Sequence, residues 1–140
     1  MIISCADGSQ DTRSGGSRSW RNNNPGNIGA GSFARRQGSI GSAATFAVFA
    51  DEFAGREAQL TLLRRADYQG MTVNGAIASW APPEAGNPTA NYQAYVLGQL
   101  GVRGDTRLNA LSAPQLGVLA DAMQAFEGWS EGTVTNNRRR

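Results

Sequence analysis

The stretch "SAPQLGVLADAMQAFEG", residues 112–128, contains the clearest helix signal in the chain. Ser112 and Gln115 stand at the spacing of a capping box, in which each side chain bonds the backbone N–H of the other residue. Gly128 is a typical residue just past a helix end. We therefore expect this stretch to form the last helix of the domain.

One acidic residue interrupts the apolar face of this helix. At about 100° per residue, the face comprises Leu116, Leu119, Ala120, Met123 and Phe126. Glu127 points between Leu116 and Ala120, so its carboxyl group is aimed at the core or at a cleft. Partial burial and the negative end of the helix dipole both raise the pKa of a carboxyl group there. Such an acid is what a glycosidase uses to protonate a leaving-group oxygen. Alternatively, a frayed helix end lets Glu127 turn into solvent.

Helical spacing of apolar residues also extends over the middle of the chain. The expected helices cover residues 52–67, which include Phe53, residues 73–80, and a segment that begins after the N-cap Asn87 and ends at Gly101. In contrast, the runs "FARRQGSI" and "TFAVFA" within residues 33–49 predict a small irregular hairpin. No other strand pair is indicated.

These elements predict one mainly α domain of the α+β class, with a β-hairpin on one side. Residues 1–19 are rich in Ser, Gly, Asp and Arg without any period, so we expect a flexible N-terminal segment. The domain then covers residues 20–134, and residues 135–140 form a basic C-terminal tail.

The composition excludes several kinds of chemistry. The 140-residue chain contains no histidine and a single cysteine, Cys5, so neither a His/Cys metal site nor an intrachain disulfide is expected. Acid–base catalysis then depends on carboxylates or tyrosine, and we expect no metal and no cofactor.

A net charge of +2 without an arginine stripe inside the domain does not indicate a nucleic-acid partner, although it suits anionic polymers such as bacterial cell wall.

The first residues, "MIISCADGSQ", lack the basic region and the long apolar run of a secretory signal peptide. No stretch approaches the roughly 20 apolar residues of a membrane span. We expect a protein that is made in the cytoplasm without a general signal peptide and that has no membrane span.

Four stretches, in order along the chain, resemble a group of small lysozyme-like proteins from bacteriophage particles and bacterial antagonism systems. They are "RNNNPGNI", "FAVFADEFAGREAQL", "IASWAPPEAGNPTANYQAYV" and "LADAMQAFEG", and the resemblance covers Trp20 to Trp129. The chain is also similar to N-acetylglucosaminidases of the lysozyme superfamily, where a Glu-Ser-Gly-Trp helix end precedes an Asn-Asn-x-x-Gly-Ile turn. Here "FEGW" comes last and "NNNPGNI" first, which implies a lysozyme-like helical domain with a circularly permuted order of the catalytic elements.

The resemblance implies that Glu127 is the general acid. A Pro-Gly turn that carries asparagine amides suits the hydroxyl and acetamido groups of a polysaccharide. The candidates for substrate binding in this turn are Asn22, Asn23, Asn24 and Asn27. We expect at least two of them only to hold the loop together.

Further candidates lie outside the asparagine turn. Tyr92 and Tyr95, which follow Asn91, resemble tyrosines that line the cleft near the acid, with core packing as the competing interpretation. Asp51 and Glu52 follow the hairpin, a region that carries the second acid in many lysozyme-like sites, and Glu52 is our candidate for it. A second acid is not obligatory, because the N-acetyl group of the substrate can attack the anomeric carbon itself.

Together these likenesses imply a peptidoglycan glycoside hydrolase, either an N-acetylglucosaminidase or a muramidase. A compact wall hydrolase without a signal peptide resembles antibacterial toxins that the type VI secretion system delivers into the periplasm of rival bacteria. Such toxins are monomers paired with a periplasmic immunity protein that occludes the active site. The alternatives are a phage virion-associated lysin or lytic transglycosylase, and a non-catalytic wall-binding or virion structural domain.

Overall fold

A computed structural model describes residues 1–4 and 9–137. Helices account for 49% of it and strands for 16%, which confirms the α+β composition. The chain divides into two compact units, of which the first is Met1–Gln59 with Glu127–Arg140 and the second is Leu60–Phe126. Cys5 and the end of the expected basic tail, residues 138–140, lie outside the described residues.

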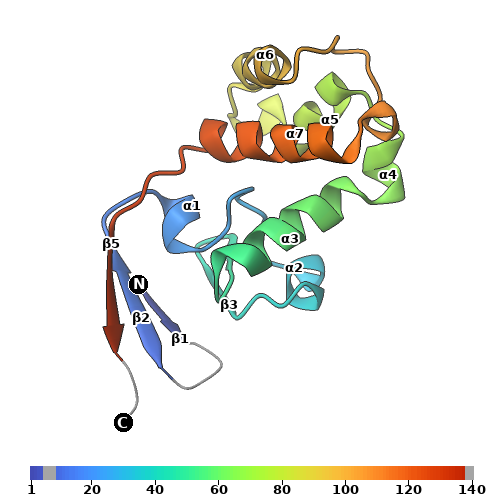
Figure 1. Ribbon diagram of the computed structural model, residues 1–140. Coiled ribbons are helices and arrows are strands. Elements are labelled where there is room, and N and C mark those ends of the chain that lie inside the picture. The colour runs from blue at the N-terminus through green and yellow to red at the C-terminus, as the bar shows by residue number, and fades with distance from the viewer. Residues whose placement is uncertain (5–8, 138–140) are drawn as a thin grey trace. The chain divides into compact units, whose positions relative to one another are not determined.

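The first unit contains a sheet that joins the two ends of the chain. Strands β1 (Ile2–Ser4), β2 (Gln10–Ser14) and β5 (Thr133–Asn137) pair in the order β1-β2-β5, and both pairings are antiparallel (Figure 1). The expectation of a flexible segment without strands over residues 1–19 is therefore wrong for β1 and β2. Local composition did not indicate these strands because the central strand, β2, pairs with β5 from the other end of the sequence.

The second sheet of this unit is the hairpin of β3 (Gly41–Ala43) and β4 (Phe46–Val48). The predicted hairpin over residues 33–49 is confirmed only for these strands, because its first run forms a helix, α2 (Ser32–Arg36). A second short helix, α1 (Arg18–Arg21), precedes the asparagine turn.

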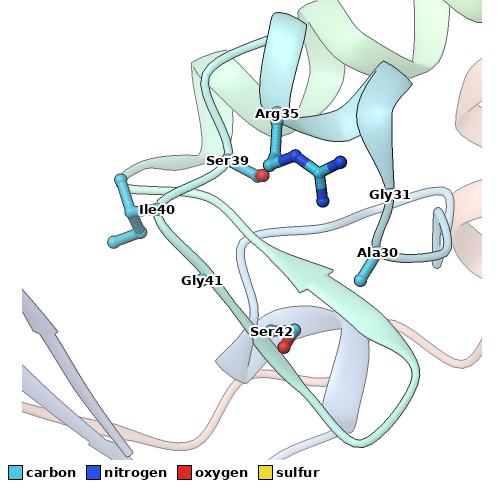
Figure 2. Close-up of a pocket in the computed structure, with 7 residues that line it drawn as sticks. All are labelled: Ala30, Gly31, Arg35, Ser39, Ile40, Gly41 and Ser42. Atoms are coloured by element: carbon cyan, nitrogen blue, oxygen red, sulfur yellow. The ribbon is translucent and has the colours of Figure 1, made fainter.

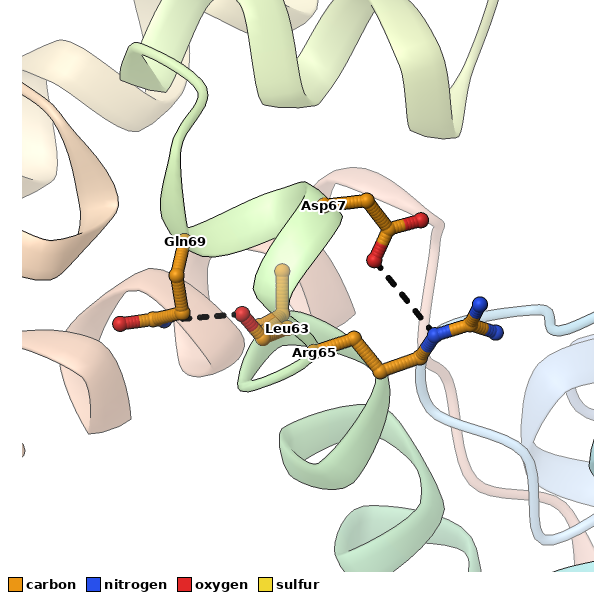
Figure 3. A network of polar contacts seen from close by, with 4 residues as sticks. All are labelled: Leu63, Arg65, Asp67 and Gln69. Carbon is orange, nitrogen blue, oxygen red and sulfur yellow. Dashed lines mark hydrogen bonds and ion pairs between the residues drawn. The ribbon is translucent and has the colours of Figure 1, made fainter.

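Helix α3 (Glu52–Leu63) begins in the first unit and ends in the second. The prediction of one helix over residues 52–67 is wrong, since the chain leaves the helical conformation at Arg65 and starts again as α4 (Ala66–Gln69). Figure 3 shows how this break is stabilised: Gln69 Nε2 donates to the Leu63 carbonyl at 2.9 Å. Phe53, which was expected on the packed face of the helix, is 74% exposed.

Three longer helices and two short 3₁₀ segments complete the second unit. They are α5 (Val73–Trp80), 3₁₀ residues Pro83–Ala85, α6 (Thr89–Leu100), 3₁₀ residues Leu108–Ala110, and α7 (Ala113–Phe126). The predicted helix over residues 73–80 is confirmed, and Gly101 ends α6 with a φ of 68°. The largest fully buried apolar side chains of this unit are Leu63, Val73, Ile77, Tyr92, Val96, Leu108, Leu119 and Met123. None of the helices in the described part of the chain is long and apolar enough to cross a membrane.

The predicted helix starts have different outcomes. The capping box of α7 is confirmed, because Ser112 N donates to Gln115 Oε1 at 2.8 Å and Gln115 N donates to Ser112 Oγ at 3.2 Å. The predicted N-cap Asn87 is wrong. Its Nδ2 donates to the Pro82 carbonyl at 2.9 Å, and Pro88 occupies the cap position of α6 without a side-chain bond.

Candidate active site

Asn24 is the centre of the asparagine turn and is fully buried. Its Nδ2 donates to the carbonyls of Ile28 at 2.9 Å and Ala47 at 3.0 Å. Its Oδ1 accepts from Ile28 N at 2.9 Å. The amide thus closes the turn and attaches it to strand β4, which leaves no surface for a sugar. The prediction that Asn24 binds substrate is therefore wrong, and its role is to hold the loop together.

Asn23 is also buried and has a positive φ of 52°, a conformation that asparagine adopts more readily than most residues. Its Nδ2 donates to the Phe49 carbonyl at 3.1 Å, so the predicted substrate contact is wrong for this residue too. Asn22 is 1% exposed, and within the described residues neither atom of its side-chain amide has a hydrogen-bond partner. At least two of these asparagines hold the loop together, as expected.

Asn27 differs from the other three asparagines, since it is only partly buried and its side chain leaves the turn. Its Nδ2 donates to Glu127 Oε2 at 2.9 Å, although the two residues are 100 positions apart in the sequence. The backbone of Asn27 has a φ of 49°, and its own N–H donates to the Asn24 carbonyl at 3.0 Å. The buried Asn24 therefore sets the position from which Asn27 reaches the acid.

Glu127 follows directly after helix α7 and is partly buried. The alternative in which it turns fully into solvent is not observed. Gly128 comes next with a φ of 83°, which turns the chain out of the helix. The expected proximity of the acid and the asparagine turn is thus present in the first unit, where an amide donor holds one carboxyl oxygen.

Residues after Glu127 are attached to the N-terminal part of the first unit. Ser17 N donates to the Ser130 carbonyl at 2.8 Å, and Ser130 N donates to Ser17 Oγ at 3.0 Å. A Cβ on Gly132 would overlap the Ser14 carbonyl oxygen, and one on Gly16 would lie 2.6 Å from the Ser130 oxygen. Backbone contacts that only glycine permits therefore fix the segment that carries the acid.

The predicted second acid lies at the start of helix α3. Asp51 Oδ1 accepts from Ala54 N at 2.7 Å and so caps the helix. Glu52 is exposed in the first turn, where the positive end of the helix dipole favours a carboxylate. This placement gives Asp51 a structural role, and the catalytic role of Glu52 stays a prediction.

The other candidates belong to the second unit. Tyr92 is 2% exposed, stacks on Phe126 with 4.2 Å between the ring centroids, and donates to the Met123 carbonyl at 3.5 Å. Core packing is therefore the correct interpretation for Tyr92, and its predicted substrate contact is wrong. Tyr95 lies 5.8 Å from the Phe126 ring and is 38% exposed, while Asn91 is exposed on the same helix. Both stay available to a ligand.

Sequence reasoning missed the glycine that brings helix α3 against the asparagine turn. A Cβ on Gly55 would overlap the Asn23 carbonyl oxygen, so the helix approaches the turn at a point where no side chain fits. An isolated glycine inside a helical pattern is the signal that indicates such a close approach.

The site's chemistry is that of a carboxyl group and amides. Among the residues that the structure describes, no three carboxylate or other metal-binding side chains gather into a cluster that could hold a metal ion. The chain matches no protein-family model, and no curated protein is significantly similar to it. The resemblance to lysozyme-like proteins therefore stays a prediction from the four sequence motifs.

Proposed function

We propose that this protein is a peptidoglycan glycoside hydrolase in which Glu127 protonates the oxygen of the leaving sugar. The observation that supports this proposal is the hydrogen bond from Asn27 Nδ2 to Glu127 Oε2 at 2.9 Å. It joins the acidic helix end and the asparagine turn, which are the two motifs that the lysozyme-like enzymes also combine. We further infer a lysozyme-like fold in which these two elements occur in permuted order.

In this mechanism Asn27 positions the acid rather than the substrate. An amide N–H on Oε2 makes that oxygen an acceptor, so the transferable proton is carried by Oε1. The orientation of the carboxyl group then depends on the turn, because Asn24 fixes the backbone of Asn27. Preorganisation of this kind places the acid without reorientation during the reaction.

Cleavage then proceeds by proton donation to the glycosidic oxygen as the bond to the anomeric carbon breaks. The resulting positive charge is quenched either by a carboxylate, for which Glu52 is the candidate, or by the N-acetyl oxygen of the substrate itself. Water then attacks the anomeric carbon, displaces that group and returns a proton to Glu127. The predicted sugar contacts of Asn91 and Tyr95, which are exposed on helix α6 of the second unit, stay a separate prediction.

The setting of the activity follows from the resemblance to type VI secretion toxins. We propose that the protein acts in the periplasm of a target bacterium and that a periplasmic immunity protein occludes its active site. Co-purification with the product of the adjacent gene tests this partner. A neighbouring product without a signal peptide and without affinity for this chain contradicts it.

The decisive experiment compares the wild type with Glu127→Gln and the control Glu131→Gln on purified sacculi. Glu131 is an exposed acid four residues further on, so Glu131→Gln makes the same exchange of carboxyl for amide outside the site. General acid catalysis contributes roughly 10²- to 10⁴-fold, and we expect Glu127→Gln to lose activity by that factor while Glu131→Gln keeps it.

Mass spectrometry of the released fragments identifies the reaction. Reducing N-acetylglucosamine ends indicate a glucosaminidase, reducing N-acetylmuramic acid ends a muramidase, and anhydro ends a lytic transglycosylase. Full activity of a folded Glu127→Gln variant refutes the assigned acid. Binding of sacculi by the wild type without any cleavage refutes the enzyme and leaves a wall-binding domain.

A further inference from the structure

A pocket of ≈ 300 Å³ lies in the first unit between helix α2 and the β3–β4 hairpin. Figure 2 shows the Arg35 side chain extending from α2, with its guanidinium between Ser39 on one side and Gly31 on the other. The lining residues are Ala30, Gly31, Arg35, Ser39, Ile40, Gly41 and Ser42. This volume is at the lower end of the range of small-molecule sites and suits one or two amino-acid residues.

The charge of the lining is of one sign. Arg35 is the only charged residue among the lining residues, and Ser39 and Ser42 add two hydroxyl groups. A guanidinium is a planar fork of donors that matches a carboxylate in a two-point contact. The pocket therefore favours an anion with planar oxygen acceptors over a neutral sugar.

The two glycines among the lining residues have open space around them. A Cβ on Gly31 or on Gly41 would meet nothing within 4 Å. Packing within the protein therefore does not require glycine at these two positions.

The pocket is connected to the candidate acid by a short, fixed segment. Ala47 N donates to the Ile28 carbonyl at 3.0 Å, and Ala30 N donates to the Thr45 carbonyl at 2.8 Å. The segment after Asn27 is thus hydrogen-bonded along β4. Ala30 is three positions after Asn27, so their Cα atoms are at most about 11 Å apart. A ligand in the pocket consequently lies close to the residue that holds Glu127.

We propose that this pocket binds a carboxylate of the peptide stem of peptidoglycan, with Arg35 as its ionic partner and the hydroxyls of Ser39 and Ser42 as further donors. The choice of polymer rests on the proposed function. In peptidoglycan the alternating N-acetyl sugars are neutral where stems are attached, and the free carboxylates belong to the stems. An arginine pocket beside the acid therefore selects glycan that carries peptides.

The binding test uses the free tripeptide L-Ala-γ-D-Glu-meso-diaminopimelate and the same peptide with its carboxylates amidated. Each is titrated into the whole protein, and amide NMR shifts are followed at residues 39–42. We expect the acidic peptide to shift these signals and the amidated one to leave them unchanged. Arg35→Gln is expected to weaken binding roughly 10- to 100-fold, the range for a charge-assisted hydrogen bond.

Arg36→Gln is the matched control, because Arg36 is the exposed neighbour on the same helix and does not line the pocket. It is expected to bind the peptide as the wild type does. The double variant Ser39→Ala and Ser42→Ala removes both proposed hydroxyl donors and keeps the charge of Arg35, and it is also expected to weaken the shifts. Equal binding by the wild type and Arg35→Gln overturns the proposal.

A kinetic test compares intact sacculi with glycan strands from which an amidase has removed the stems. Arg35→Gln is expected to raise KM on intact sacculi with little change in kcat, and to match the wild type on bare glycan. If the wild type has equal KM values on intact sacculi and on bare glycan, the proposed role of the pocket is overturned, while the proposed hydrolase activity stands. Peptide binding that depends on Arg35 in a protein that cleaves neither substrate supports the pocket and refutes the hydrolase. Inorganic phosphate that competes at micromolar concentration overturns the carboxylate assignment.

Discussion

The two units of this molecule are stabilised by different interactions. In the second unit an apolar cluster from α5, α6 and α7 forms the core, and stacked rings such as Tyr92 and Phe126 contribute to it. In the first unit the interior is rich in polar groups. Of the buried polar or charged residues among those described, Ser9, Arg13, Ser19, Asn22, Asn23, Asn24 and Gln59 belong to the first unit, and Thr89 alone to the second.

This difference shows in which unit the side chains have to be held in exact positions. Apolar packing tolerates exchanges of similar volume, whereas a buried hydrogen bond requires one donor and one acceptor in one geometry. The unit that carries Glu127 uses the second kind of interaction. We expect substitutions in the polar interior of the first unit to disturb the site at a distance, and those in the apolar core of the second unit to act through stability alone.

The largest effect is expected for Asn24→Ala. The change removes three hydrogen bonds from a fully buried position, and we expect a loss of about 3 kcal/mol in the free energy of unfolding. Urea unfolding measures the loss, and activity on sacculi should fall with it because Asn27 shifts. Asn109→Ala, on an exposed position without a role in the site, is the control. A variant with wild-type stability contradicts the structural role of Asn24.

Next in size is the pair Gly55→Ala and Gly98→Ala. A Cβ at Gly55 overlaps the Asn23 carbonyl, while one at Gly98 in α6 meets nothing within 4 Å. We expect Gly55→Ala to cost about 2 kcal/mol through backbone displacement and Gly98→Ala to gain about 0.5–1 kcal/mol from helix propensity. Thermal unfolding of both variants tests this, and equal effects would show that the contact at the turn is unimportant.

The smallest effect concerns Tyr68 in the second unit. Burial raises the pKa of its phenol above the ordinary value of 10.0, and the hydrogen bond with Ser79 opposes this shift. The unfolded chain then loses the proton at a lower pH than the folded one. Stability from this group is complete below pH 10 and decreases as the pH rises from there toward the folded pKa.

Urea midpoints between pH 8 and pH 11 measure this decrease, whose slope is at most about 1.4 kcal/mol per pH unit for one group. Tyr68→Phe removes the ionisation and should show a shallower decrease over the same range. Identical slopes for the wild type and Tyr68→Phe would refute the effect of burial.

Sequence patterns predicted the fold best where interactions are local. The capping box of Ser112 and Gln115 and the helix over residues 73–80 both depend on residues within one or two turns, and both are confirmed. Strands β1 and β2 were missed, because β1 pairs only with β2 and the other partner of β2, strand β5, lies at the opposite end of the chain. The break at Arg65 was missed as well, since it depends on a side-chain bond from Gln69 to a helix-end carbonyl.

The sequence predicted which residues belong to the candidate site more successfully than it predicted the role of each residue. Periodicity identified Glu127 as an acid out of place in its helix, and the structure joins it to Asn27. Composition could not distinguish the asparagine that reaches the acid from the buried ones, because all four occur in one short turn. Tyr92 and Tyr95 were also indistinguishable by spacing, and only packing against Phe126 separated the buried ring from the exposed one.

By itself, the sequence determined the helix over residues 73–80, the capping box of the last helix, the absence of histidine and the acidic residue at the end of the last helix. Those features follow from residue type and from spacings of three or four positions. Only the tertiary structure decided that Asn24 closes the turn while Asn27 holds the acid, and that Arg35 lines a pocket on the same unit. Such roles depend on contacts with groups that are far away in the sequence, and local spacing contains no information about these contacts.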